Sequence, residues 1–285
     1  MVNKYRLLGA YAHPDDEQGV SGLMYKYASE GVDVTLVCAT RGEAGEIAPG
    51  VNATPENLGQ VREDELRCAA EKIGVNNVYW LDYRDSGMMG TPPNADARCL
   101  WQANLLEVTE KLVRIIRRHK PHVVTTFDPN GGYGHPDHIK IHQATLMAYF
   151  LSGDARVYPE QISQGLAPWT ISKLYWGAFP KSRFAKYAEM AKQAGIEIGV
   201  PMQEFLKRGS PDEIITTRID VSPYVDLKLS ALFCHASQMN PNSIFSKIPI
   251  EIRKEGLKTE TLVRAESRIV VTEPETDLFT GIESV

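Results

Sequence analysis

Short apolar segments of strand length alternate with longer, helix-like segments through the first half of the chain, and this order limits the folds open to it. The expected strands are residues 5–11, 34–39, 78–81 and 123–127, and the expected helices are about 17–30, 56–73, 101–119 and 136–151. Strands that alternate with helices form a parallel sheet covered by helices. The sequence therefore predicts an α/β fold with a doubly wound, mainly parallel, Rossmann-like sheet.

The second half of the chain has a weaker pattern. It predicts a strand at 173–179, helices at 182–194 and 222–239, and an extended tail from about 265. No clear linker divides the chain, and 285 residues lie within the range of one α/β unit. We therefore expect a single domain over 1–285, with a core of about 1–180 and a C-terminal α/β elaboration at about 181–285.

The charge and apolar patterns argue against two classes of partner. A net charge of −5 gives no basic footprint for nucleic acid. The densest basic stretch, 114–120, has apolar residues at helical spacing, so we interpret it as the solvated face of a helix, with phosphate binding as the alternative. No segment has the roughly 20 apolar residues that cross a bilayer. We expect neither a nucleic-acid nor a membrane partner.

The four cysteines, Cys38, Cys68, Cys99 and Cys234, have no paired spacing. They fit neither a zinc ribbon nor a disulfide framework, and Cys68 and Cys234 are interpreted as core thiols in helix-like segments. The first apolar stretch has the length of a strand and does not resemble a signal peptide. The expected location is therefore a reducing compartment, the cytoplasm.

Two His-Pro-Asp tripeptides follow two of the expected strands. The first lies in Ala12–Glu17, and the second, His135–Asp137, is followed at once by His138. Loops that follow parallel strands gather at one edge of the sheet, where such folds bind their ligands. Glu43 and Asp85 lie in two further loops of this kind. The sequence therefore predicts one site, assembled at this edge from distant residues.

Three of these residues make a metal-ligand set. Imidazole and carboxylate groups bind zinc and similar divalent metals, and a catalytic zinc ion typically has three protein ligands. His13 and Asp16 are three residues apart across a strand-to-helix turn, so both can face one point. With His138 they form a two-histidine, one-carboxylate set, and we predict that it binds Zn²⁺. Fe²⁺ suits the same ligands, and availability often decides between such metals.

The remaining polar residues of the two motifs are suited to proton transfer. Asp15 is not needed as a ligand and can take a proton from water activated by the metal. His135 can face the substrate as a cation or proton donor, and Asp137 can hold its ring and raise its pKa. Tyr133, in a glycine-rich and flexible loop, offers a phenol to a developing oxyanion. These groups predict hydrolysis of an amide or ester.

Simpler interpretations of the same segments stay open. A single His-Pro-Asp can be an ordinary turn whose aspartate caps a helix, although two copies at matching strand ends argue against this. Glu17 is interpreted only as the start of a helix. His142, one helical turn after His138, can form a ligand pair with it or can lie deeper in the helix, packed or hydrogen-bonded, and we favour the second. Arg41 and Glu43 can form a surface pair.

The motifs resemble those of a known family. Ala12–Glu17 and Gly134–His138 are similar to the paired motifs of the PIG-L/LmbE-like family of zinc-dependent N-acetylglucosaminyl deacetylases. Supporting similarity extends through most of the chain, at Thr40–Glu46, Tyr83–Met88, Gly131–Gly134, Pro168–Leu174 and His235–Gln238. The chain most resembles the bacterial branch, which includes the mycothiol-pathway deacetylase and the mycothiol S-conjugate amidase.

The resemblance implies a role for each site residue. The family's zinc ligands match His13, Asp16 and His138. Asp15 matches the family's general base. His135 matches the histidine that stabilises the oxyanion and protonates the amine, and Asp137 matches the partner that orients this histidine. Tyr133 matches the tyrosine that polarises the carbonyl. Its positions for sugar hydroxyls match Arg62, Asp85 and Glu46. These roles agree with those reached from spacing, which could not have identified Arg62.

We therefore expect a zinc-dependent amidohydrolase that removes the acyl group, acetyl by preference, from an N-acetylglucosamine-containing small molecule or glycoconjugate. One alternative is cleavage of a cysteinyl-glucosamine amide, as in mycothiol S-conjugate amidase. The tail 273–283 resembles the amidase, whereas Arg84–Met88 resembles the deacetylase. A second alternative is a non-catalytic metal- or sugar-binding module. The expected partner is a small-molecule amino sugar, and assembly into a homo-oligomer is left open.

Overall fold

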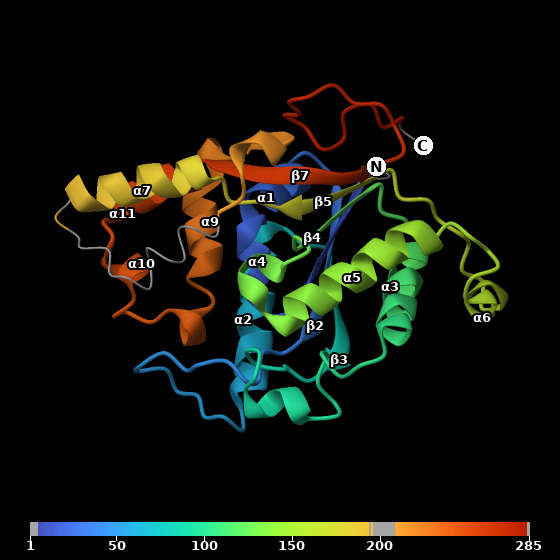
Figure 1. Ribbon diagram of the computed structural model, residues 1–285, viewed down its shortest axis with the longest axis horizontal. Coiled ribbons are helices and arrows are strands. Elements are labelled where there is room, and N and C mark those ends of the chain that lie inside the picture. The colour runs from blue at the N-terminus through green and yellow to red at the C-terminus, as the bar shows by residue number, and fades with distance from the viewer. Residues whose placement is uncertain (1–4, 194, 196–208, 284–285) are drawn as a thin grey trace.

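The computed structural model describes residues 5–193, 195 and 209–283, and within them one sheet has the strand order β3-β2-β1-β4-β5-β7-β6 (Figure 1). The first five strands are parallel: β1 Arg6–Tyr11, β2 Asp33–Thr40, β3 Asn77–Tyr83, β4 Val123–Thr126 and β5 Lys173–Gly177. β7, Thr259–Ser267, pairs antiparallel with β5, and β6, Thr217–Asp220, pairs antiparallel with β7. The predicted α/β fold with a mainly parallel sheet is confirmed. The two strands of the second half extend this same sheet and were not predicted as a pair.

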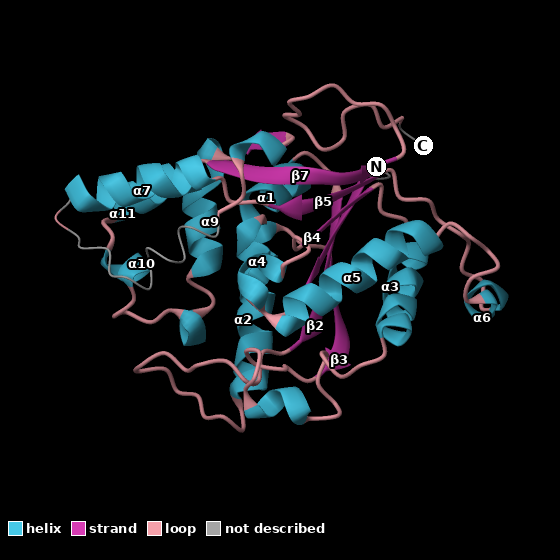
Figure 2. Ribbon diagram, in the orientation of Figure 1, coloured by secondary structure: helices cyan, strands magenta, loops and turns pink. Residues whose placement is uncertain are grey.

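Helices cover both faces of the sheet (Figure 2). One face carries α1 Ser21–Ser29, α2 Leu58–Ile73 and α9 Val225–Leu232, and the other carries α3 Leu105–His119 and α5 Pro136–Leu151. Successive side chains of a strand point to opposite faces. In β1, Leu7 and Tyr11 accordingly join the first core, whereas Leu8 and Ala10 join the second. Burial on both faces explains why the strands are continuous apolar runs.

The remaining helical segments are short, except for α7. They are η1 Asp16–Gly19, η2 Pro92–Ala95, α4 Gly131–Gly134, α6 Pro159–Ser163, α7 Lys181–Gln193, η3 Asp212–Ile214, η4 Ser222–Tyr224, η5 Ala236–Gln238, α10 Ile244–Lys247 and α11 Ile250–Leu257. α7 is the helix expected at 182–194, of which residue 194 lies outside the described residues. The glycine-rich segment expected to be a loop is the helical turn α4. In the described part of the chain, no helix is long and apolar enough to cross a membrane.

The helix expected at 222–239 is wrong as a single helix. α9 ends at Leu232, and the chain turns through Cys234 and His235 before η5. This turn directs His235 inward, where its Nε2 lies 2.7 Å from a carboxylate oxygen of Glu17 and both side chains are buried. The partner lies 218 residues away in sequence, so local periodicity carries no sign of it.

Cys68 and Cys234 form a disulfide, so their interpretation as free thiols is wrong. Cys68 lies on the exposed side of α2, Cys234 follows α9, and packing of these two helices brings the Cα atoms to 5.8 Å. The two cysteines are 166 residues apart, which leaves no spacing signature. Cys38 and Cys99 are free and buried. The expected reducing compartment rested on unpaired cysteines and loses that support.

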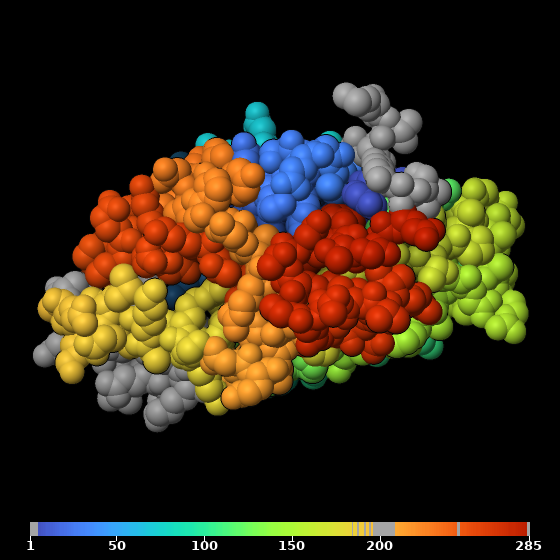
Figure 3. Space-filling model, turned by 90° about the horizontal axis from the view of Figure 1, so that it is seen from above, coloured from blue at the N-terminus to red at the C-terminus, as the bar shows by residue number. Residues whose placement is uncertain are grey.

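A buried ion pair fastens the segment after β7 to the sheet. The Glu275 carboxylate lies 2.7 Å from Lys173 Nζ, and it also accepts hydrogen bonds from Tyr175 and Arg264. Lys173 Nζ donates in turn to the backbone carbonyl of Leu278. The tail expected to be extended therefore folds over the sheet after Ser267, and Figure 3 shows these C-terminal residues in red across the top of the molecule.

Glu275→Gln tests this ion pair. It leaves the buried ammonium of Lys173 without its counter-charge, so we expect the free energy of unfolding in urea at pH 7 to fall by about 3–5 kcal/mol. The matched control is Glu273→Gln, because Glu273 binds Arg264 at the surface, where its side chain is 53% exposed. We expect the control to lose less than about 1 kcal/mol. Equal losses in the two variants would contradict the assignment.

Candidate functional site

The two His-Pro-Asp motifs meet at the carboxyl edge of the parallel strands. His13 follows β1, His135 and His138 follow β4, and these two strands are neighbours. From β1 the sheet continues through β2 and β3 on one side and through β4 and β5 on the other. The strand order therefore reverses between β1 and β4, which is the place where doubly wound sheets bind ligands. The predicted convergence of the two motifs is confirmed.

The donor atoms of the three predicted ligands form a small triangle. His13 Nδ1 lies 3.1 Å from His138 Nε2. The two carboxylate oxygens of Asp16 lie 3.3 Å from His13 Nδ1 and 3.3 Å from His138 Nε2, respectively. Ligand atoms about 2.0–2.1 Å from a tetrahedral ion are about 3.3–3.4 Å from one another. The three distances are close to these spacings, with a different Asp16 oxygen next to each histidine nitrogen.

The other nitrogen of each histidine contacts an oxygen atom. His13 Nε2 lies 3.2 Å from Asp137 Oδ2 and 3.4 Å from Asp85 Oδ1. His138 Nδ1 lies 3.1 Å from the carbonyl oxygen of Gly131. Metal-binding histidines commonly donate their second N–H to a carboxylate or a carbonyl in this way. Such contacts leave the lone pairs of His13 Nδ1 and His138 Nε2 directed into the triangle.

Gly131 meets a steric requirement of this arrangement. Its φ is +61°, and an added Cβ would lie 2.6 Å from the Cβ of His138 and 2.8 Å from the next backbone nitrogen. A side chain would therefore push α5 away from the loop whose carbonyl orients His138. Glycine at this position is needed to keep its carbonyl against His138, in addition to forming the turn.

The site is strongly acidic around its imidazoles. Burial disfavours a charged His13, but the carboxylates of Asp85, Asp137 and Asp16 outweigh it and raise the pKa of His13 well above its usual value. Burial likewise opposes ionisation of Asp16, yet His138 and His13 hold its pKa well below the usual range. A buried group of carboxylates of this kind favours a bound cation.

Two overlapping groups of side chains could hold a metal ion. In His13, His135 and His138, and again in His13, Asp85 and Asp137, one ligand atom from each residue lies within 4.8 Å of the others. All five side chains are buried. The described residues thus contain a buried His/Asp cluster suited to a metal ion, and it includes the predicted ligands His13 and His138 but not the predicted ligand Asp16.

Asp15 lies beside this cluster in a strained turn. Its φ of 103° and ψ of −20° are costly for a residue other than glycine. Its backbone N–H donates to Glu17 at 3.0 Å, and its carboxylate accepts from Arg62 at 3.1 Å. Burial, with a further contribution from Asp16, raises the pKa of Asp15 to about 6 against the opposing effect of Arg62. Asp15 is therefore a stronger proton acceptor than an ordinary aspartate.

Asp137 does not hold the ring of His135, which corrects the predicted contact. Its carboxylate contacts His13 and accepts hydrogen bonds from the backbone and the hydroxyl of Ser86. His135 Nδ1 accepts the backbone N–H of Asp137 at 3.2 Å. Burial and the imidazoles of His13 and His138 lower the pKa of His135 to about 4, whereas the sequence predicted a raised pKa.

Tyr133 lies at the opening of the cluster. Its ring packs edge-on to His138 at 5.2 Å and to His135 at 6.1 Å between ring centroids, and the residue is 41% exposed. Burial of its phenol raises the pKa, so the hydroxyl keeps its proton. A cavity of about 210 Å³ begins here, lined by Asp16, Tyr133 and His138 together with aromatic residues that include Phe127 and Phe179.

The three predicted sugar-binding residues lie in different places. Arg62 is buried, and its guanidinium contacts Asp15. Asp85 is buried against His13 and accepts backbone N–H groups from Ala44 and Gly87. Glu46 is exposed and lines a separate cavity of about 230 Å³, together with Ser237 and Gln238. The structure thus brings Arg62 and Asp85 to the cluster, whereas Glu46 lies in another hollow.

The open alternatives for other residues are decided by their contacts. His142 is buried with its Nδ1 2.7 Å from the carbonyl oxygen of Phe127, so the favoured interpretation, packing within the helix, is confirmed. Arg41 pairs with Glu63 and Asp82 in place of the expected Glu43.

Several supporting residues were missed. Glu17 does more than begin a helix, because its buried carboxylate joins Asp15 to His235. Ser86 fixes the Asp137 carboxylate. The only available signals were that Glu17 belongs to the first motif and that Ser86 follows Asp85, and neither names its partner.

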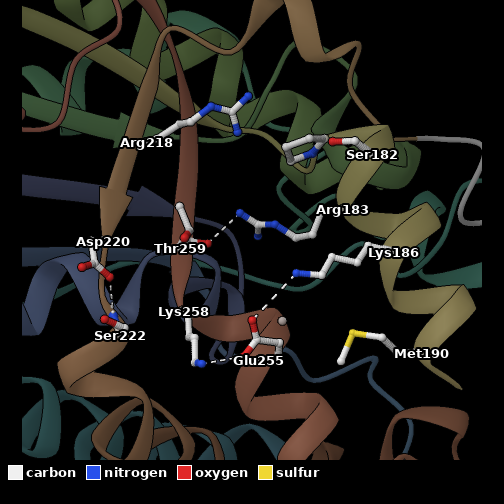
Figure 4. A pocket seen from close by; sticks show the side chains of 12 residues that line it. Ser182, Arg183, Lys186, Met190, Arg218, Asp220, Ser222, Glu255, Lys258 and Thr259 are labelled. Atoms are coloured by element: carbon white, nitrogen blue, oxygen red, sulfur yellow. Dashed lines mark hydrogen bonds and ion pairs between the residues drawn. The ribbon is translucent and has the colours of Figure 1, made fainter. Parts of the chain in front are cut away.

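A second cavity shares one lining residue, Arg183, with the cavity at Tyr133. It has a volume of about 600 Å³ and is lined by α7, β6, α11 and the start of β7 (Figure 4). Arg183 lines both cavities, and its guanidinium donates to the carbonyl of Thr259 at 2.6 Å and to the hydroxyl of Thr261 at 3.1 Å. Lys186 and Glu255 face each other across the second cavity at 3.8 Å. The second half of the chain therefore forms one wall of the site.

Comparisons with known proteins agree with this geometry. Residues 8–149 match the family model PIG-L, described as GlcNAc-PI de-N-acetylase. The chain is 40% identical over 249 residues to 1D-myo-inositol 2-acetamido-2-deoxy-alpha-D-glucopyranoside deacetylase of Thermobifida fusca, a match that covers 84% of this chain and 85% of that protein. It is 36% identical over 293 residues to mycothiol S-conjugate amidase of Streptomyces coelicolor, covering 99% of each. It shares the fold of N,N'-diacetylchitobiose deacetylase from Pyrococcus horikoshii, with a TM-score of 0.63, 23% identity, and 90% of this chain and 82% of that chain covered. The chain belongs to the PIG-L family of deacetylases and amidases.

Proposed function

We propose that this protein is a zinc-dependent amidohydrolase that removes the acetyl group from an N-acetylglucosamine-containing small molecule. The observation that carries the proposal is the largely buried donor triangle of His13, Asp16 and His138, with Asp15 next to Asp16 in the same turn. The relatives support the substrate class, because the Thermobifida fusca protein is named for deacetylation of a glucosamine–inositol compound.

The donor set supports zinc as the metal. Two imidazoles and one carboxylate are a frequent ligand set for catalytic zinc, which leaves a position open for water or substrate. A zinc ion held there supplies a Lewis acid that polarises the amide carbonyl and lowers the pKa of a water molecule. Fe²⁺ is the alternative that this ligand set also accommodates.

Asp15 is the proposed general base. A pKa of about 6 suits a general base, because the carboxylate is ionised near neutrality. It would readily accept a proton from a water molecule whose pKa a bound metal had lowered. Arg62 and Glu17 hold the strained turn, so the carboxylate is fixed before substrate arrives. The proton that Asp15 accepts is then available for the departing amine.

His135 and Tyr133 are the proposed donors to the oxyanion. Because His135 Nδ1 accepts a backbone N–H, a neutral ring carries its proton on Nε2 and can donate it in a hydrogen bond. A pKa of about 4 keeps this ring neutral at pH 7, which favours hydrogen bonding over proton donation to the amine. The protonated phenol of Tyr133, at the opening of the cluster, is the second donor.

The remaining predicted residues receive supporting roles. We assign Asp137 to orienting His13, because its carboxylate contacts that ring. Asp85, in the same cluster, and Arg62 are assigned to sugar hydroxyls, and Arg62 also positions Asp15. Glu46 is assigned to the outer part of the substrate, since it lies exposed on a separate hollow.

A second candidate activity is cleavage of a larger acyl group, such as a cysteinyl-glucosamine amide. The observation that favours it is space: Arg183 lines both the cavity of about 210 Å³ beside the ligands and a larger one of about 600 Å³, although an acetyl group needs room only for a methyl. The likeness to a mycothiol S-conjugate amidase supports the same candidate.

The ligand assignment predicts a difference between two histidines on one helix. His138→Gln should weaken zinc binding by more than the roughly 10–100-fold that loss of an orienting partner costs. His142→Gln should bind zinc as the wild type does, because His142 contacts only a backbone carbonyl in the polar contacts described. Competition with a fluorescent chelator measures both affinities, and metal analysis of the purified wild type separates zinc from iron. Equal weakening in both variants would refute the assignment.

The general-base assignment predicts a selective loss of turnover. Asp15→Asn should lower kcat roughly 10²–10⁴-fold in an amine-release assay while zinc binding is unchanged. The matched control is Asp64→Asn on the exposed surface of α2, where the side chain is 62% exposed, and it should retain wild-type kcat. Full turnover in a metal-loaded Asp15→Asn protein would exclude this mechanism.

The choice between deacetylase and amidase is tested by a substrate panel. One series keeps a glucosamine–inositol unit and varies the acyl group from acetyl to propionyl to an S-substituted N-acetylcysteinyl group. The other keeps acetyl and varies the aglycone. We expect the highest kcat/KM for the acetyl compounds. A highest value for the cysteinyl amide would identify the second candidate as the main activity, and no release from any member would reject both.

A further inference from the structure

The disulfide of Cys68 and Cys234 is placed where solvent can reach it. Cys68 is exposed on α2, and Cys234 is partly buried after α9. The other two cysteines, Cys38 and Cys99, are buried at 1% and 0% exposure. A thiol reagent in solution therefore meets the disulfide before it meets either free thiol.

On one side of the disulfide, α2 holds the turn at Asp15. α2 carries Arg62 two turns before Cys68. Arg62 Nη2 donates to the carbonyl of Pro14 at 2.5 Å and to the carboxylate of Asp15 at 3.1 Å, and its Nη1 donates to the carbonyl of Gly42 at 3.0 Å. The position of α2 consequently sets the position of the carboxylate beside the ligands.

On the other side, the residue after Cys234 reaches the same turn. His235 Nε2 lies 2.7 Å from one oxygen of Glu17, and the second oxygen of Glu17 accepts the backbone N–H of Asp15 at 3.0 Å. Asp15 has a φ of 103°, so its backbone keeps this conformation only while such contacts hold it. Both sides of the disulfide therefore lead to one strained residue.

A third contact ties the two sides together. Ser237 donates from its backbone and its hydroxyl to the carboxylate of Glu65, at 2.6 and 2.7 Å, one turn before Cys68 on α2. The carbonyl of Ser237 accepts the N–H of Ala48 at 2.8 Å. The turn at 235–238 thus joins α2, the Asp15 turn and the loop that carries Glu46, and the disulfide fastens the chain to α2 at Cys234, the residue before this turn.

We propose that the Cys68–Cys234 disulfide is a thiol-exchange site through which an external dithiol controls the geometry of Asp15. A dithiol supplies two electrons and two protons: its thiolate attacks one sulfur, the Cys68–Cys234 bond breaks, two cysteine thiols form, and the dithiol closes to a cyclic disulfide. Opening this bond removes the covalent tie between α2 and the 235–238 turn. Noncovalent contacts alone then hold Asp15, and turnover falls. The activity arm of this proposal rests on the proposed function.

The structural arm uses metal-free protein and needs no catalysis. A maleimide should label none of the four cysteines before reduction, and should label Cys68 and Cys234 after treatment with dithiothreitol. Reduction should speed hydrogen exchange at the amides of Asp15 and Ser237 at least roughly tenfold and leave the amide of Val124, in the central strand β4, unchanged. Unchanged exchange at Asp15 and Ser237 after confirmed reduction would overturn the proposal.

The activity arm compares the wild type with Cys68→Ser. Dithiothreitol should lower the kcat of the wild type roughly tenfold, as expected when a catalytic group is loosely positioned, and glutathione disulfide should restore it. Cys68→Ser should have the lower kcat with or without dithiothreitol. This variant keeps Cys38, Cys99 and the metal ligands, so any effect of the dithiol on these groups would appear in it.

The two arms distinguish failure of the disulfide proposal from failure of the proposed function. If reduction lowers the melting temperature but leaves kcat and hydrogen exchange at their oxidised values, the disulfide is a structural cross-link only, and the proposal is wrong. If neither redox state releases amine from any amino sugar, the proposed function fails instead. In that case the exchange of the Asp15 and Ser237 amides still decides whether the disulfide controls this turn.

Discussion

The parallel pairing of β1 with β4 sets the geometry on which the site depends. Leu7 lies opposite Val123 and Gly9 opposite Thr125, so the chain leaves both strands at the same edge of the sheet. His13 and His138, 125 residues apart in sequence, therefore meet with their ring nitrogens 3.1 Å apart. Helices cover both faces of these strands, and a close-packed interior of this kind resists small displacements. The packed sheet therefore also restricts movement of the donor atoms that follow its strands.

The strained turn at Asp15 needs a different kind of support. A residue in this region of backbone conformation costs about 1–3 kcal/mol, which the surrounding contacts must offset. Arg62 and Glu17 provide these contacts. Glu17 is itself buried, and its carboxylate lies 2.7 Å from Nε2 of His235; burial lowers the pKa of His235, but Glu17 and nearby carboxylates raise it by more. The turn at Asp15 is thus held by a chain of polar contacts that extends to the C-terminal half.

The sequence alone predicted the site residues that directly follow the parallel strands. His13, Asp16 and His138 follow from apolar runs that end in polar motifs, and the structure places their donor atoms together. The partners of Glu17 and Cys68 could not be predicted, because they lie 218 and 166 residues away and no local period records them.

The orientation of a side chain was equally inaccessible from the sequence. The rotation of α5 about its axis decides whether the Asp137 carboxylate faces His135 or His13, and the motif is the same in either case. The predicted direction of the His135 pKa was wrong for the same reason. Asp137 faces His13, so its carboxylate does not raise the pKa of His135 enough to offset burial. The strands β6 and β7 were not predicted because β7 pairs with β5 from about 90 residues later in the chain. Both strands lie in the half of the sequence with a weak pattern.

The family model ends before the part of the chain that forms the C-terminal wall of the site. The model covers residues 8–149, which hold every residue assigned here to metal binding and proton transfer. Phe179, Arg183 and Thr261, which line the far wall of the cavity beside the ligands, lie beyond it. Yet a relative named as a deacetylase and one named as an S-conjugate amidase match 97% and 99% of this chain, at 37% and 36% identity. A shared fold and a shared set of reactive groups do not determine which amide is cleaved. The choice of acyl group is therefore expected to lie in the C-terminal wall, where Arg183 stands between the two cavities.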